Sequence, residues 1–223
     1  GTQWYEWDKV GAYPGASAVQ CGDRIAFQML KWLDEHSYDS YLSFADPDGS
    51  HCVTTKIKDS RSLNYKDGWV YIIYKDDCIY KVKTDGSGRE KIFEAKSSIE
   101  GTTGVLLSEL LLAHDKLYVF ENIHYGKEEK SIFMRMNLDG SGAETIDEFV
   151  HLDATDKSDW YSYWPSVFYD SGAMYYTNTD LNKSTYDIYK YDIAANNKTC
   201  VESGIVSDYG CKIAARGVIL YYR

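Results

Sequence analysis

The 223-residue sequence predicts an all-β fold, a single β-propeller domain spanning residues 1–223 and built of four-stranded antiparallel blades. The first observation is composition: the chain has 21 Tyr, 6 Trp and only 3 Pro, and Tyr and Trp favour half-buried strands. The second is an apolar strand that recurs along the chain behind a turn. The third is an Asp-Gly-Ser turn that recurs in step with that strand.

The recurring strand defines five repeats. Its equivalent positions are spaced 45, 47, 57 and 45 residues apart, at Ile25, Val70, Leu117, Met174 and Ile219. The second repeat contains four predicted strands, at 62–65, 69–74, 78–83 and 90–93. A four-stranded unit of this period, without helical periodicity, is typical of a propeller blade, whereas a β-sandwich would not need the same turn in each unit.

The recurring turn is clearest in residues 79–92, which predict a strand, a tight turn and a return strand. Gly86 and Gly88 supply the positive φ that a tight hairpin needs, and Asp85 can bond its own backbone. The other copies are Asp48-Gly49-Ser50, Asp139-Gly140-Ser141 and a degenerate one that ends in Asn196-Asn197. We interpret this turn as the outer turn of a blade, which sets the register of the ring and does not bind a ligand.

The ends of the chain predict five blades. The last repeat has strands near 212–215 and 218–222, and an unassigned strand-like piece lies at residues 3–10. Because an open ring leaves an unpaired edge, we expect the N-terminal piece to supply an outer strand that closes the last blade. A six-bladed ring, or a fragment of a longer propeller, is the alternative.

Two stretches carry a family resemblance. The segment Met174-Tyr175-Tyr176-Thr177-Asn178, followed by residues 188–190, and the segment 138–146 resemble the YWTD-type propellers of lipoprotein receptors. They are still more similar to a bacterial propeller domain of unknown function found in exported proteins. This sequence departs from those families in its count of five blades and in a degenerate Tyr-Tyr-Thr-Asn core. The resemblance implies extracellular or cell-surface binding or scaffolding in a bacterium, and it carries no catalytic residue.

The charge balance narrows the class of partner. A formal net charge of -10 argues against nucleic acid and against anionic membranes, since either would need a basic patch. No apolar run approaches the length of a membrane span, so no membrane insertion is predicted. The start at Gly1, without Met or a signal peptide, is compatible with an exported protein after removal of its targeting segment, and with a lipid anchor outside this chain.

The cysteines do not predict a disulfide framework. There are five, an odd number without a C-x-x-C pair: Cys21, Cys52, Cys78, Cys200 and Cys211. We expect small buried strand residues, with a Cys200–Cys211 bridge as the one alternative.

Loop lengths predict which face of the propeller carries the binding site. In a four-stranded blade, the turns between the second and third strands lie on the same face as the blade-to-blade connections. The long predicted connections all belong to that face: 31–40, 121–130 and 177–185 within blades, and 94–104 and 148–164 between blades. Loops longer than a connection requires are common places for binding sites.

Aromatic and polar residues gather in three of these loops. The predicted ligand-binding residues are Trp32, Glu35, His36 and Tyr38 in the first loop, His124 and Tyr125 in the second, and Asp156, Asp159, Trp160, Tyr161 and Trp164 in the third. Such side chains can stack on a sugar ring and bond its hydroxyls, or hold a peptide. The alternative is that alternate rings, such as Tyr163 and Trp164, pack into the neck of the fourth blade.

Catalytic and metal-binding motifs are not found. His36 and His124 lack the spacing of metal ligands, and Asp46-Pro47-Asp48-Gly49 fits a turn better than a calcium loop. We therefore predict no cofactor, no metal and no catalytic residue. The predicted function is a binding module for a carbohydrate or protein partner. The alternatives are a glycosidase-type enzyme, with Glu35, Asp153 or Asp159 as its carboxylates, and a structural spacer of a cell-surface protein.

Overall fold

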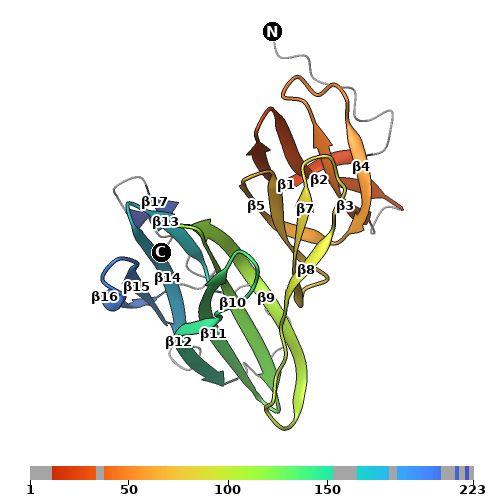
Figure 1. Ribbon diagram of the computed structural model, residues 1–223. Helices are drawn as coiled ribbons and strands as arrows, with labels where there is room; N and C mark the ends of the chain where they lie inside the picture. The colour runs from red at the N-terminus through yellow and green to blue at the C-terminus, as the bar shows by residue number, and fades with distance from the viewer. Residues whose placement is uncertain are drawn as a thin grey trace. The chain divides into compact units, whose positions relative to one another are not determined.

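The computed structural model describes residues 12–33, 38–152, 165–180, 185–206, 214–215 and 219–220 (Figure 1). Every regular element in these ranges is a β-strand, and the strands form four four-stranded antiparallel sheets and one two-stranded pair. The all-β propeller prediction is confirmed, while the number of five blades stays a prediction. None of the described segments forms an apolar helix of membrane-spanning length.

The chain divides into two compact units. The first comprises Gly1–Lys96 with Asn137–Ser141, and the second comprises Ser97–Met136 with Gly142–Arg223. The expectation of one domain over residues 1–223 stays a prediction.

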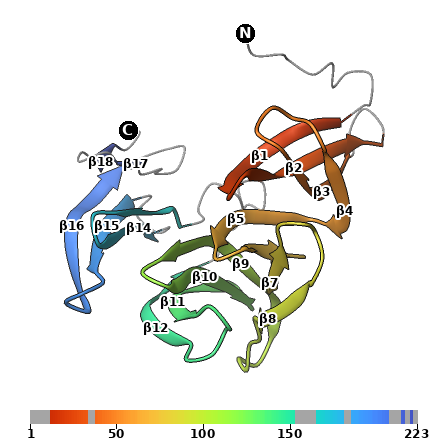
Figure 2. The same cartoon turned by 45° about the horizontal axis from the view of Figure 1, so that its top comes forward.

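The first unit contains two sheets. One has the strand order β1 (Ala12–Cys21), β2 (Arg24–Trp32), β3 (Tyr38–Ala45), β4 (Val53–Lys58), and the other has the order β5 (Ser60–Lys66), β6 (Trp69–Tyr74), β7 (Cys78–Lys83), β8 (Glu90–Glu94). The predicted strands 69–74 and 78–83 are reproduced residue for residue. Strand β5 contacts β1, β2 and β3, so the first strands of the two sheets are neighbours (Figure 2).

The second unit contains two more sheets and the short pair. The strands of the third sheet are β9 (Thr102–Ala113), β10 (Lys116–Tyr125), β11 (Glu128–Asn137) and β12 (Glu144–Leu152); the fourth has β13 (Val167–Asp170), β14 (Ala173–Asp180), β15 (Thr185–Asp192) and β16 (Asn197–Val206). The pair is β17 (Ala214–Ala215) with β18 (Ile219–Leu220). Strand β13 contacts both β9 and β17, which again makes the first strands neighbours. The predicted closing strand, residues 3–10, lies outside the described residues.

The Asp-Gly-Ser turns have one shared geometry. In the second sheet, the Gly86 N–H donates to the Lys83 carbonyl at 2.8 Å and the Ser87 N–H donates to Asp85 Oδ1 at 2.8 Å. The same pair of bonds recurs at Asp46–Ser50 and at Asn137–Ser141. In the degenerate copy Asn196 has φ 51°, as expected for a residue that tolerates the left-handed region. The interpretation of Asp46–Gly49 as a turn is confirmed.

Each unit has its own apolar core. In the first, Val70, Ile72 and Val82 of the second sheet pack with Leu42 and Phe44 of the first. In the second, the rings dominate: the centroids of Phe120 and Phe133 are 4.7 Å apart, and those of Phe133 and Tyr176 are 4.8 Å apart. The aromatic-rich composition therefore fills the space between sheets, where large rings bury the most area.

The predicted loop 121–130 is wrong. Strand β10 continues to Tyr125 and β11 begins at Glu128, so only Gly126 and Lys127 form the turn, with Gly126 at φ 58°. His124 and Tyr125 thus lie on a strand, paired with Gly104 and Thr102 of β9. The polar residues that suggested a loop are accommodated inside the sheet: buried Asn122 donates to Ser108 Oγ at 2.9 Å and accepts from Ser131 Oγ at 2.7 Å.

The other long connections also shorten, because the strands on either side extend into them. Strand β12 reaches Leu152, β14 reaches Asp180, and the connection from β8 to β9 spans residues 95–101. Loop length is therefore a weaker marker of the binding face than the sequence indicated.

The cysteine prediction is half right. Cys21 and Cys78 are buried, but Cys52 and Cys200 are exposed because they lie in the β3–β4 connection and on the outer strand β16. Cys200 is a free thiol. Cys211, its possible bridge partner, lies outside the described residues.

Candidate functional site

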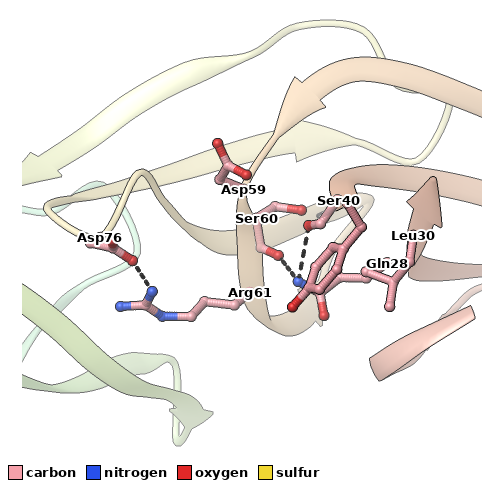
Figure 3. A pocket seen from close by; sticks show the side chains of 8 residues that line it. Gln28, Leu30, Ser40, Asp59, Ser60, Arg61 and Asp76 are labelled. Atoms are coloured by element: carbon pink, nitrogen blue, oxygen red, sulfur yellow. Dashed lines mark hydrogen bonds and ion pairs between the residues drawn. The ribbon is translucent and has the colours of Figure 1, made fainter. Parts of the chain in front are cut away.

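A pocket of about 310 Å³ lies in the first unit, where its two sheets meet (Figure 3). Its lining residues come from four short stretches: Gln28 and Leu30 on β2, Tyr38 and Ser40 on β3, Asp59, Ser60 and Arg61 at the start of β5, and Asp76 in the β6–β7 turn. These stretches adjoin second-to-third-strand turns and the β4–β5 blade connection. The pocket therefore opens at the ends of the strands that the sequence predicted to form the binding face.

One wall of the pocket is uncharged and polar. The Gln28 side-chain amide Nε2 donates to the Ser60 carbonyl oxygen and lies 3.5 Å from Ser40 Oγ. Figure 3 shows Ser60 between this group and the Arg61–Asp76 pair. The Ser60 side chain is fully buried, and its Oγ has no hydrogen-bond partner within the described part of the chain. A buried hydroxyl without a hydrogen-bond partner lowers the free energy of unfolding by about 1–3 kcal/mol. This wall therefore contains an unsatisfied polar group.

The other wall is charged. The Arg61 guanidinium forms an ion pair with the Asp76 carboxylate, which connects β5 to the β6–β7 turn. The exposed Asp59 side chain also lines the pocket and forms no ion pair within the described ranges. The wall thus has two carboxylates and one guanidinium, a formal charge of −1.

The backbone around these charges is held in uncommon conformations. Asp59, Lys75 and Asp76 have φ values of 52°, 52° and 68°, in the left-handed region. Two hydrogen bonds fix this backbone: the Asp59 N–H donates to the Ser40 carbonyl at 2.9 Å, and the Lys75 N–H donates to the Asp59 carbonyl at 3.3 Å. Left-handed residues other than Gly cost free energy and are enriched at functional sites and turns.

The rim of the pocket carries an exposed ring. Tyr38 is 53% exposed, and Leu30 on the neighbouring strand is half-buried. The adjacent Asp39 is held by Lys58 Nζ at 2.6 Å and by the Tyr41 hydroxyl at 2.8 Å. The Lys58 bond, followed by the Tyr41 bond, lowers the pKa of the Asp39 carboxyl, which therefore stays ionised at neutral pH. These bonds anchor the start of β3 and with it the position of Tyr38.

Of the eleven predicted ligand-binding residues, the structure brings one to this pocket, Tyr38. The backbone of Trp32 lies at the end of β2, and its side chain lies outside the described atoms. Seven others lie outside the described residues: Glu35, His36, Asp156, Asp159, Trp160, Tyr161 and Trp164. Asp153, a carboxylate of the alternative glycosidase, also lies outside them.

The remaining two, His124 and Tyr125, lie on β10 in the second unit. His124 Nδ1 is 3.3 Å from Glu129 Oε2, and burial, followed by a hydrogen bond to Glu128, raises the pKa of the Tyr125 hydroxyl. Both side chains are thus engaged with carboxylates of the adjoining strand β11.

Sequence reasoning missed Gln28, Ser40, Asp59, Ser60 and Asp76. Each stands in an ordinary strand or a short turn. The pairing of β5 with β6 brings Asp59 and Ser60 near Asp76, and the contact of β5 with β2 and β3 adds Gln28 and Ser40. Asp59 is the single residue that connects β4 with β5.

A second, smaller cavity of about 180 Å³ lies in the second unit, lined by Arg135, Glu144, Thr145, Ile146, Tyr191, Asn196 and Lys198. Its cations are already neutralised: Arg135 pairs with Glu144, and Lys198 Nζ lies 2.7 Å from Asp147 Oδ1. The Arg135 hydrogen bond also lowers the pKa of the Glu144 carboxyl. This cavity is therefore a weaker candidate than the pocket beside Tyr38. No group of three or more metal-ligating side chains is present among the described residues.

No protein-family model and no curated protein sequence matches this chain. Solved structures do. An acylaminoacyl peptidase in complex with Z-Gly-Gly-Phe-chloromethyl ketone is 12% identical, with a TM-score of 0.59 over 95% of this chain and 35% of that one. An oligogalacturonate lyase in complex with manganese is 10% identical, with a TM-score of 0.57 over 86% of this chain and 54% of that one.

The β-propeller domain of the Trilobed protease from Pyrococcus furiosus, described as having an open velcro topology, is 14% identical. Its TM-score is 0.54 over 86% of this chain and 58% of that one. At these identities the likeness establishes the propeller fold and nothing further. The chain spans between about a third and three-fifths of the length of these three structures. The YWTD-type subclass is not shown by them and stays a prediction.

Proposed function

We propose that this chain is a non-catalytic binding module that recognises a glycan through the pocket beside Tyr38. The observation that carries the proposal is an exposed aromatic ring at the rim of a small polar pocket. A sugar presents an apolar ring face and a belt of hydroxyls, so it needs an aromatic platform and several hydrogen-bonding groups at one place. Tyr38 would be the platform, and Gln28, Asp59 and Asp76 the hydrogen-bonding groups.

The size of the pocket supports a small unit of recognition. A volume of about 310 Å³ is at the lower end of the range for ligand sites, about 300–1,000 Å³. We therefore expect one or two sugar residues to enter it, and a longer glycan to continue across the adjoining surface. A protein partner, the other partner predicted from the sequence, would instead need a much larger contact area.

Binding is favoured over hydrolysis by the state of the carboxylates. A glycosidase needs one protonated carboxyl as an acid and one ionised carboxylate. In this pocket the Arg61 ion pair favours the ionised form of Asp76. The ion pair therefore argues against Asp76 as the protonated acid of a glycosidase.

The similar solved structures favour neither a glycan nor a protein as the partner of this chain. Their names describe peptidases and an oligogalacturonate lyase, and those activities belong to proteins of which this chain spans only a part. The proposal includes an extracellular or cell-surface location, supported by the acidic composition and by the resemblance to exported propellers.

A glycan array followed by titration calorimetry tests the proposal. We expect the wild-type chain to bind a defined set of glycans, and Tyr38→Ala to weaken that binding by about tenfold or more, because the platform is lost. Tyr169→Ala is the matched control, since Tyr169 is also exposed, at 41%, and does not line the pocket. An array without any bound glycan, or equal losses for the two variants, would contradict the proposal.

A further inference from the structure

The charges of the pocket bear on which class of sugar it takes. Asp59 and Asp76 contribute two negative charges and Arg61 one positive charge, so the lining has a formal charge of −1. Arg61 and Asp76 neutralise each other through their ion pair. The uncompensated charge is therefore that of Asp59, whose carboxylate has no ion-pair partner within the described part of the chain.

The hydrogen-bonding groups have the same bias. The Gln28 amide uses its Nε2 donor on the Ser60 carbonyl oxygen, which leaves its Oε1 as an acceptor. The Asp59 carboxylate adds acceptors, and the ion pair of Asp76 with Arg61 is formed by its Oδ1. Hydroxyl and ammonium groups donate to such acceptors, whereas a carboxylate brings only acceptors of its own.

We propose that the pocket selects neutral or amino sugars and rejects uronates and other acidic sugars, and that Asp59 sets this preference. The inference rests on the proposed function, since it names the class of glycan for the same site. A sugar carboxylate placed beside Asp59 meets a like charge, whereas a protonated amine at the same carbon meets an opposite one. At a partly exposed site, such a charge difference changes affinity by about tenfold.

The test uses sugars that differ in one substituent. Glucose, 6-amino-6-deoxyglucose and glucuronate, which differ only at C6, and the three corresponding galactose derivatives are coupled through the same spacer and titrated at pH 6. We expect the uronates to bind about tenfold more weakly than the neutral sugars, and the amino sugars to bind at least as tightly. Added salt should reduce both differences, since it screens exposed charges.

The variant Asp59→Asn identifies the responsible group. Asn keeps the left-handed backbone that residue 59 requires, at φ 52°, and removes only the charge. We expect it to bring uronates and neutral sugars to equal affinity. Asp67→Asn is the matched control: Asp67 is exposed, has φ 48°, and lies just beyond the opposite end of β5.

The outcomes separate this inference from the proposed function. Uronates that bind as tightly as the neutral sugars, or a preference that survives in Asp59→Asn, would overturn the inference and leave a glycan-binding module. An absence of binding by every sugar would overturn the proposed function, and this inference with it.

Discussion

The Ser60 hydroxyl is buried without a hydrogen-bond partner among the described residues, at a cost in stability. Two buried serines of the first unit differ in this respect. The Ser43 hydroxyl donates to Thr54 Oγ1 at 3.1 Å, while the Ser60 hydroxyl has no partner among the described residues. Both side chains are fully buried, so each hydroxyl gives up its hydrogen bonds to water on folding.

The pair of variants Ser60→Ala and Ser43→Ala tests this difference. We expect Ser60→Ala to raise the free energy of unfolding by about 1 kcal/mol, because an unsatisfied hydroxyl is removed. Ser43→Ala should lower the free energy of unfolding by about 1 kcal/mol, because a made hydrogen bond is lost. Urea unfolding measures both, and a Ser60→Ala variant as destabilised as Ser43→Ala would show that Ser60 is a structural residue.

Cys78 gives a prediction about alkaline stability. Burial, followed by a hydrogen bond to Asp77, raises the pKa of its thiol from 9.0 to about 11. Between these values the unfolded chain releases the thiol proton and the folded chain retains it, so the free energy of unfolding falls as the pH rises from 9 to 11. We expect Cys78→Ala to make this decline shallower without abolishing it, since burial raises the pKa of Tyr118 and Tyr176 as well.

Urea titrations under reducing conditions at pH 8, 9, 10 and 11 measure the effect. Cys200→Ala serves as the control because Cys200 is an exposed free thiol. Identical pH profiles for Cys78→Ala and the wild-type chain would contradict the assignment.

At the level of single elements, the Asp-Gly-Ser turns join neighbouring strands of the first unit. A Cβ added at Gly86 would lie 3.0 Å from Thr55 Cγ2, and one added at Gly140 would lie 1.9 Å from the Ile92 carbonyl oxygen. The Arg24 guanidinium also donates to the Thr84 carbonyl at 3.1 Å. The recurrence of this turn is thus explained by packing as well as by φ.

Gly140→Ala tests that packing role. Gly140 and Gly68 have nearly the same φ, 82° and 83°, and both belong to the first unit, but a Cβ at Gly68 meets nothing within 4 Å. We expect Gly68→Ala to cost about 1–2 kcal/mol of left-handed strain. Gly140→Ala should cost at least about 2 kcal/mol more, because backbone atoms must move. Equal losses of unfolding free energy in the two variants would mean that Gly140 is required only for its positive φ and not for close packing.

Strand bounds could be predicted from the sequence where local residue pattern and turns determine them. They could not be predicted where buried contacts with other strands determine them. Strands 69–74 and 78–83 follow from alternation and from the Gly-containing turns beside them. The extension of β10 through Glu121 and Asn122 could not be predicted, because two consecutive polar residues are typical of a loop. The hydrogen bonds of Asn122 with Ser108 and Ser131, which permit its burial in the sheet, are visible only in the structure. The site followed the same division: Tyr38 was predicted from its aromatic loop, whereas Gln28 and Ser40 meet Ser60 only through the contact between the first two sheets.

At the scale of the whole molecule, the repeat predicted the propeller, and four four-stranded sheets confirm it. The likeness to propellers at 10–14% identity shows how little sequence the fold requires beyond turns, alternation and large rings. The number of five blades and the closing role of residues 3–10 stay predictions. So does the binding role of the loop 153–164, which competes with the pocket beside Tyr38 for the same proposed ligand.

A crystal structure with the tightest glycan from the array decides between these two places most directly. We expect electron density for a sugar ring against Tyr38, with hydroxyl or amino groups within hydrogen-bonding distance of the Asp59 carboxylate. Density for the sugar against Trp160 and Tyr161, with the pocket between the first two sheets empty, would contradict the proposed site.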